Sequence, residues 1–148
     1  YGHEQKGVPL VEKLCQRLRV PNNFKSLALQ VTQYHTHCHK VLELRAGTLV
    51  DLLQTLGTFK QANQIEGFVL ACEADARGRL GFENTFYESG DFFRQAVKIA
   101  LETDTSAALN RGLEGKKVGE EIRRLRINAL NALFSFEFQT SGSCRTHR

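Results

Sequence analysis

Apolar residues recur at intervals of three and four along most of the chain, and this spacing constrains the fold more than any other feature. Such spacing places apolar side chains on one face of a helix, whereas a half-buried strand alternates polar and apolar residues. Residues 8–18 show it first, with Val8, Val11, Cys15 and Leu18 along one stripe. No segment of strand-like alternation competes with it. The sequence therefore predicts an all-α fold of about seven helices without a sheet.

The boundaries of the next helices follow from residues that start or end helices. Pro21 suits a first helical turn and precedes a second stripe that runs from Phe24 to Cys38. We expect Thr48 and Ser89 to cap the third and fifth helices. Between them, residues 65–76 form a fourth helix, and residues 80–88 form a loop with buried aromatic side chains.

The C-terminal part of the chain is predicted to hold two more helices. A short helix covers about Ser106–Asn110, and the last helix begins near Val118. Its inward residues are expected to be Ile122, Leu125, Ala129 and Leu133. Residues 134–148 follow as a flexible C-terminal tail.

The formal net charge of +4 resides in the C-terminal part of the chain. Residues 1–110 contain 12 Lys and Arg against 12 Asp and Glu, whereas residues 111–148 contain eight against four. A basic segment indicates an anionic partner, and nucleic acid is the first candidate. The alternative is a solvated tail without a partner.

The last predicted helix carries most of these cations. We predict that it contacts RNA phosphates through Lys116, Lys117, Arg123, Arg124 and Arg126. Glu120 and Glu121 offset part of this charge, so a solvated helix with internal ion pairs is the alternative. Recognition of a folded RNA through its shape and backbone fits better than base stacking, because aromatic and basic residues do not alternate here.

The segment EADARGRLGFE (73–83) concentrates charge near a helix end. Glu73 with Arg77, and Asp75 with Arg79, stand four residues apart with the acid first, which favours pairs within a helix. We expect Gly81 and Phe82 to lock the turn that follows against the core. Arg77 and Arg79 are also candidates for RNA phosphate contacts, oriented by these acids.

The segment YHTHCH (34–39) raises the question of a metal site. Only His35 and His39 share a face of a helix and could bind one ion together. His3 is the candidate for a third ligand, and the alternative is that these histidines only face solvent. No nucleophile elbow, P-loop or dinucleotide fingerprint occurs, so no self-contained catalytic site is visible.

The remaining features indicate the cellular compartment of the protein and whether the chain is part of a longer one. No run approaches the roughly 18 apolar residues of a membrane helix, and no signal segment opens the chain. The four cysteines lack paired spacing, and three lie on apolar stripes, so we expect reduced thiols in a cytoplasmic protein with no membrane partner. The chain starts at Tyr1 and contains no Met, so we expect a piece of a longer protein.

Three stretches carry a family resemblance: GHEQKGVPLVEKLCQRLRVPN (2–22), EADARGRLGFE (73–83) and GLEGKKVGEEIRRLRINAL (112–130). They resemble the C-terminal part of bacterial multifunctional CCA-adding enzymes, which are tRNA nucleotidyltransferases of the gammaproteobacterial type. The resemblance implies a parent that adds C, C and A to tRNA 3′ ends from CTP and ATP with Mg²⁺. It also implies that the nucleotidyltransferase head is absent from this chain, which we expect to be inactive alone.

The same resemblance divides the chain into three parts. Residues 1–45 resemble the end of an HD phosphohydrolase domain, with His3 as a remnant of a site for Ni²⁺ or another divalent metal. Residues 46–133 are expected to be the helical body and tail that bind tRNA, and residues 134–148 a flexible tail. The family commonly has Asp after the His of YHTHCH, whereas Thr36 stands here. The alternatives are a metal-dependent phosphohydrolase acting on 2′,3′-cyclic phosphates and a plain helical interaction module.

Overall fold

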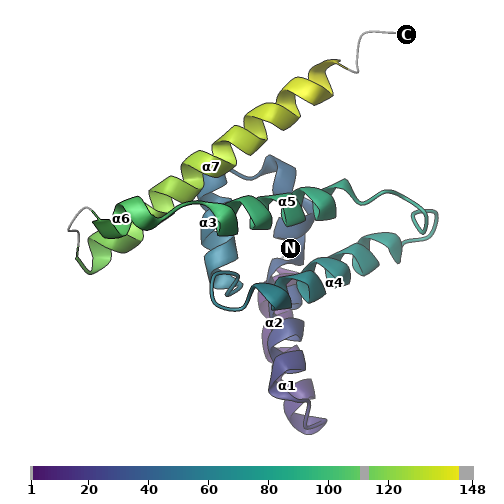
Figure 1. Cartoon of the computed structure of the whole chain (residues 1–148). Helices are drawn as coiled ribbons and strands as arrows, with labels where there is room; N and C mark the ends of the chain where they lie inside the picture. The colour runs from purple at the N-terminus through teal and green to yellow at the C-terminus, as the bar shows by residue number, and fades with distance from the viewer. Residues whose placement is uncertain (1, 111–113, 144–148) are drawn as a thin grey trace.

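The computed structural model describes the backbone of residues 2–110 and 114–143 and the side chains of residues 2–108 and 114–135. Within these ranges the chain contains helices and no strand, which confirms the all-α prediction. The seven α-helices are α1 (His3–Arg17), α2 (Asn22–His39), α3 (Ala46–Thr55), α4 (Ile65–Arg77), α5 (Glu88–Glu102), α6 (Ser106–Asn110) and α7 (Lys116–Ser143) (Figure 1). Two 3₁₀ turns, Val41–Glu43 and Ala62–Gln64, lead into α3 and α4.

The core lies where α2, α3, α4, α5 and α7 meet. Phe68 of α4 and Phe93 of α5 are fully buried there, with ring centroids 5.8 Å apart. Leu130 of α7 is also fully buried, so the long last helix closes the core. Three cysteines are buried and free, as expected for small apolar side chains: Cys15, Cys38 and Cys72. Cys144 lies outside the described residues.

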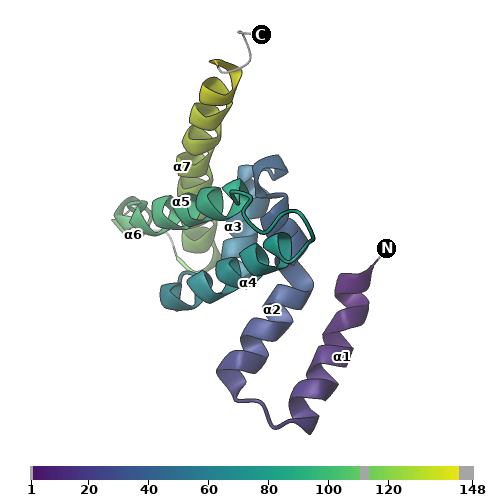
Figure 2. The same cartoon turned by 90° about the vertical axis from the view of Figure 1, so that its right-hand side faces the viewer.

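Helices α1 and α2 form an antiparallel hairpin that projects from the rest of the molecule (Figure 2). A Cβ atom at Gly7 would lie 2.8 Å from Thr32 Cγ2, so the absence of a side chain lets the helices approach closely. Because α1 packs mainly against α2, the far side of the hairpin faces solvent. Leu18 and Phe24, which lie on the two predicted apolar stripes, are therefore exposed.

Neither of the two predicted caps is a cap. Helix α3 begins at Ala46, which places Thr48 inside its first turn. Helix α5 begins at Glu88, and the hydroxyl of Ser89 donates a hydrogen bond of 2.8 Å to the carbonyl of His39 in α2. Ser89 thus joins two helices instead of satisfying the start of its own.

Helix α7 is longer than the sequence predicted at both ends. It begins at Lys116 and continues to Ser143, so residues 134–143 extend the helix and do not start a separate tail. At the start of this extension Phe134 packs against Phe92, with ring centroids 5.0 Å apart. Residues 144–148 lie outside the described part, and the division into three parts stays a prediction. None of the described helices combines the length and apolarity needed to cross a bilayer.

Candidate functional site

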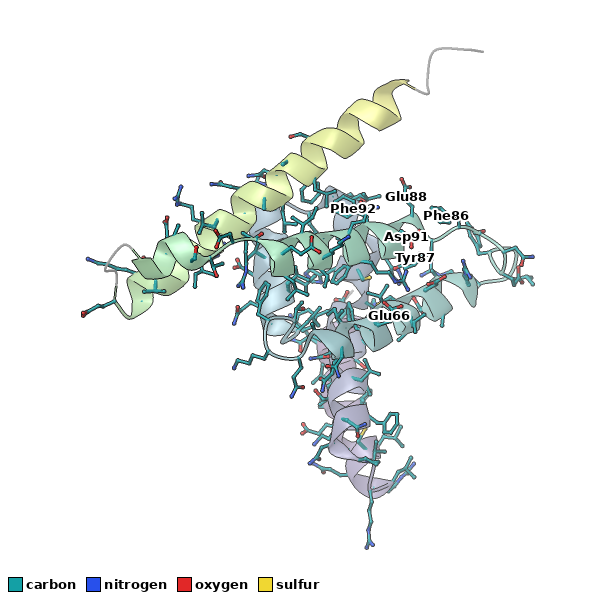
Figure 3. All side chains as sticks on the ribbon, viewed as in Figure 1. Glu66, Phe86, Tyr87, Glu88, Asp91 and Phe92 are labelled. Carbon is teal, nitrogen blue, oxygen red and sulfur yellow. The ribbon has the colours of Figure 1, made fainter. Side chains whose placement is uncertain are left out.

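The ends of the α1–α2 hairpin, the end of α4 and the connection from α4 to α5 surround a cleft of about 460 Å³. Its walls combine three kinds of side chain that lie far apart in the sequence. The histidines, cations and aromatic residues that line it are His3, His35, His39, Lys40, Arg77, Arg79, Phe82, Phe86 and Tyr87. Figure 3 shows Phe86 and Tyr87 where the connection enters α5.

The fold brings together two of the three predicted metal ligands. The Nε2 atoms of His3 and His35 lie 3.3 Å apart, whereas His39 directs its own Nε2 atom to Asp75 Oδ2 at 2.9 Å. The side chains that the structure describes include no group of three or more ligand residues arranged to hold a metal ion. The described side chains thus form no complete metal site by themselves, and the metal role of His3 stays a prediction.

His39 forms the centre of a chain of hydrogen bonds at the floor of the cleft. Because a carboxylate only accepts, Nε2 of a neutral His39 carries the proton and donates to Asp75. Its Nδ1 atom then accepts from the hydroxyl of Tyr87 at 2.8 Å. Burial raises the pKa of Tyr87, which keeps this hydroxyl protonated. The chain of hydrogen bonds ties α2, α4 and the start of α5 together.

The predicted ion pairs of the EADAR segment are present. Glu73 and Arg77 are 3.0 Å apart, and Asp75 and Arg79 are 3.8 Å apart. The Nε atom of Arg77 also donates to the carbonyl of Thr85 at 3.2 Å, which ties the helix end to the connection. Arg77 thus has a structural function within the chain, and its predicted phosphate contact is untested.

A second network on the same two helices centres on Arg94. This guanidinium lies 2.7 Å from Glu66 and 3.5 Å from Glu73 on α4, and 3.3 Å from Asp91 on its own helix. Figure 3 shows Glu66 on α4 and Asp91 on α5, the two helices that Arg94 joins. The hydrogen bonds from Arg94 hold the pKa of Glu66 below its usual value.

The Glu66–Arg94 pair is expected to make stability depend on acid pH. The folded-state pKa of Glu66 is lowered, so its contribution is complete above the unfolded-state pKa and is lost as pH falls through the folded value. Because the pair is half exposed, we expect Glu66→Gln to cost less than about 1 kcal/mol at pH 7. Urea unfolding of both proteins at pH 7 and pH 3 measures this difference, which should shrink at the lower pH. An equal difference at both values would contradict the assignment.

Two of the three aromatic residues of the connection are exposed, so the prediction that they are buried is wrong for these two. Phe82 is 54% exposed and Phe86 is 69% exposed, while Tyr87 is partly buried. Phe82 therefore does not lock the turn against the core. The turn depends on Gly81, whose φ of 88° favours glycine, and on the hydrogen bond from Phe82 N to Arg79 O.

The predicted cations of α7 are on its surface, but most have partners within the chain. Arg123 donates to both oxygens of Asp51 on α3 at 2.7 and 2.8 Å. Arg124 donates to both oxygens of Glu121 at 2.8 and 2.6 Å, and Lys116 lies 3.5 Å from Glu120. Lys117 makes no ion pair with any side chain that the structure describes.

Arg126 differs from the other four cations because it packs against the body. Its Cζ atom lies 3.5 Å from the centroid of the Phe59 ring, and its Nε atom donates to the carbonyl of Ala100. Burial lowers the pKa of Arg126. The sequence did not indicate this role or the link from Arg123 to Asp51, because both partners are remote along the chain.

The chain is similar in sequence to known bacterial proteins. Three proteins, each named Multifunctional CCA protein, are similar to the chain along most of its length. The protein of Hahella chejuensis is 46% identical over 130 residues, covering 88% of this chain and 31% of the relative. That of Alkalilimnicola ehrlichii is 46% identical over 132 residues (89% and 32%), and that of Pseudomonas fluorescens 42% identical over 131 residues (88% and 32%).

These similarities show to which proteins the chain is related. It is homologous to part of the gammaproteobacterial multifunctional CCA proteins, which confirms the resemblance found in the sequence. The chain spans about a third of the length of the relatives it matches. No protein-family model and no solved structure matches it.

Proposed function

We propose that this chain is the tRNA-binding part of a multifunctional CCA protein. The observation that carries the proposal is the identity of 42–46% to proteins of that name over 88–89% of the chain. Addition of C, C and A from CTP and ATP, with Mg²⁺, is assigned here to the full-length parent. The described side chains contain no group of three or more ligands placed to hold a metal ion.

The surface of α7 supports phosphate contacts despite its ion pairs. Arg123 and Arg124 are half exposed, and the partner of Arg123, Asp51, is half exposed as well. An ion pair exposed on both sides contributes only about 0–1 kcal/mol, so an RNA phosphate can share or replace Asp51 at little cost, and the planar guanidinium suits bidentate contact. Lys117 adds an exposed cation at the start of the same helix.

The proposal is tested by binding of the chain to full-length tRNA over a series of salt concentrations. We expect affinity to fall steeply with salt, and the double variant Lys117→Ala/Arg124→Ala to reduce the logarithmic salt slope by about two, because two phosphate contacts are lost. The matched control, Lys6→Ala/Lys13→Ala, removes the same charge from α1, which packs mainly against α2. Weak binding that salt does not change would overturn the proposal and favour the plain interaction module.

Arg123 needs a separate control because it also joins α7 to α3. Arg123→Ala removes both the cation and the pair with Asp51, whereas Asp51→Asn removes only the charge of the partner. If Arg123 contacts RNA, Arg123→Ala weakens tRNA binding and Asp51→Asn preserves it. Equal losses in the two variants would show that Arg123 acts only through the packing of α7.

The hydrolase alternative has one observation in its favour, which is the approach of His3 to His35 within the cleft. Its weakness is that His39 uses both ring nitrogens within the chain. We expect the chain with added Ni²⁺ or Mg²⁺ to release no product from 2′,3′-cyclic AMP. Hydrolysis that is lost in His3→Ala would establish the alternative instead.

A further inference from the structure

We propose that the outward face of α1 is a contact surface within the full-length parent, where a segment that lies outside this chain covers it. We infer that this segment is amphipathic. Its apolar side chains contact Leu10 and Leu14, and acidic side chains beside them pair with Lys13 and Arg17. This surface goes beyond the proposed function, because it rests on the homology to multifunctional CCA proteins and does not depend on tRNA binding.

Helix α1 has two apolar faces, and only one of them is covered. The covered face lies next to α2, is at least partly buried, and consists of Val8, Val11 and Cys15. On the outward face, Leu10 is 66% exposed and Leu14 is 45% exposed, and Leu18 at the end of the helix is 61% exposed. A single exposed leucine is common, but a row of them at helical spacing marks an interaction surface. The second face therefore indicates a second neighbour for α1.

The outward face is basic as well as apolar. It contains a groove of about 360 Å³ that is lined by Leu10, Lys13, Leu14 and Arg17. Lys13 and Arg17 are exposed and form no ion pair with any side chain that the structure describes. Glu12, between them and α2, is instead bound at 3.0 Å by Lys25 of α2. Two cations beside an apolar groove are complementary to a partner that carries Asp or Glu beside its own apolar side chains.

The length of the relatives indicates which partner covers this face. The match to the protein of Hahella chejuensis covers 88% of this chain but 31% of the relative, so more than two thirds of that protein has no counterpart here. A helix of 15 residues is about 22 Å long and about 10 Å wide, so one face offers on the order of 200 Å².

This area is too small for a separate protein or a second copy of the chain. A stable complex between separate chains needs about 800 Å² from each partner. A segment of the same polypeptide needs less, because the covalent connection keeps its effective concentration high. The remainder of the parent is therefore the occupant that the size of the face fits.

The test compares this chain alone with a fused protein in which the chain replaces the matching segment of the protein of Hahella chejuensis. The thiol of the Leu14→Cys variant is labelled with N-ethylmaleimide, and peptide mapping by mass spectrometry gives its rate. We expect labelling to be at least about tenfold slower in the fused protein, because the face is covered only there. Leu80→Cys is the control. Leu80 is 95% exposed in the connection from α4 to α5, and its variant should react equally fast in both proteins.

Three outcomes would overturn the inference. The first is an equal rate at residue 14 in both proteins, and the second is equal protection at residues 14 and 80, which would mean general shielding. The third is a rate at residue 14 that falls as the concentration of the isolated chain rises, because a second copy would then cover the face. Adding Lys13→Glu/Arg17→Glu should speed labelling in the fused protein alone, and an unchanged rate there would contradict an acidic partner.

A second measurement is needed in case the fused protein does not fold. Cys38 reports folding, because it is fully buried and should react slowly in both proteins. If Cys38 reacts quickly, hydrogen exchange of the natural protein of Hahella chejuensis replaces the labelling. Its helix corresponding to α1 should exchange at least about tenfold more slowly than α1 of this chain, relative to the helices corresponding to α4 and α5. Equal exchange would overturn the inference. Protection of α1 without any binding of tRNA would contradict the proposed function and support this inference.

Discussion

Phe93→Ala is expected to lower the free energy of unfolding by about 3–5 kcal/mol. The Phe93 ring is fully buried beside Phe68, where α5 packs against α4. Removing it forfeits the transfer energy of the ring and leaves a cavity that rigid neighbouring helices fill only in part. Chemical denaturation followed by the far-ultraviolet circular dichroism of the helices measures the loss.

The exposed ring of Phe24 provides the control for this substitution. Phe24→Ala removes the same atoms from the outer side of the α1–α2 hairpin, so we expect a cost within about 0.5 kcal/mol. If both variants lost the same stability, the core would not be centred on Phe93. Retention of helical signal by Phe93→Ala without denaturant shows that a stability difference, and not misfolding, is measured.

Gly90→Ala is expected to lower the free energy of unfolding by about 1–3 kcal/mol, although alanine favours helices. Gly90 is buried in the first turn of α5, and a Cβ atom there would lie 2.6 Å from Cδ1 and 2.9 Å from Cε1 of Tyr87. The Tyr87 ring would have to move, and the hydrogen bond from its hydroxyl to His39 would be strained or lost. Thermal unfolding of the variant measures the cost.

Gly119 provides the matched control because it is also a helical glycine. A Cβ atom there meets nothing within 4 Å, so Gly119→Ala should raise the free energy of unfolding by about 0.5–1 kcal/mol. Opposite signs at the two positions would establish that Tyr87 crowds Gly90. A gain of stability in both variants would mean that the start of α5 adapts to the added methyl group.

The contacts of the candidate site that lie within one helix could be predicted from the sequence. The pairs Glu73–Arg77 and Asp75–Arg79 depend only on helical spacing, and both are present. The approach of His3 to His35 and the contact of His39 with Asp75 join residues more than 30 positions apart. Helical spacing carries no information about such contacts, because they depend on how α1, α2 and α4 cross.

The exposure of the aromatic side chains before α5 also could not be predicted from the local sequence pattern. An aromatic residue in a short connection is usually buried because its transfer from water is favourable. Phe82 and Phe86 remain exposed because the connection lies over a cleft and not over the core. The opposite error occurred at Phe134, which the sequence assigned to a tail and which packs against Phe92.

By itself the sequence determined that the chain is all-α, where most helices lie and that it is homologous to part of the multifunctional CCA proteins. Periodicity and identity are both properties of neighbouring residues along a chain, so they need no coordinates. Only the tertiary structure decided which cations are paired. Arg123 is bound to Asp51 and Arg126 lies against Phe59 because α7 crosses the body at one particular place. A crossing depends on packing between distant segments, and that packing is set by the fold as a whole.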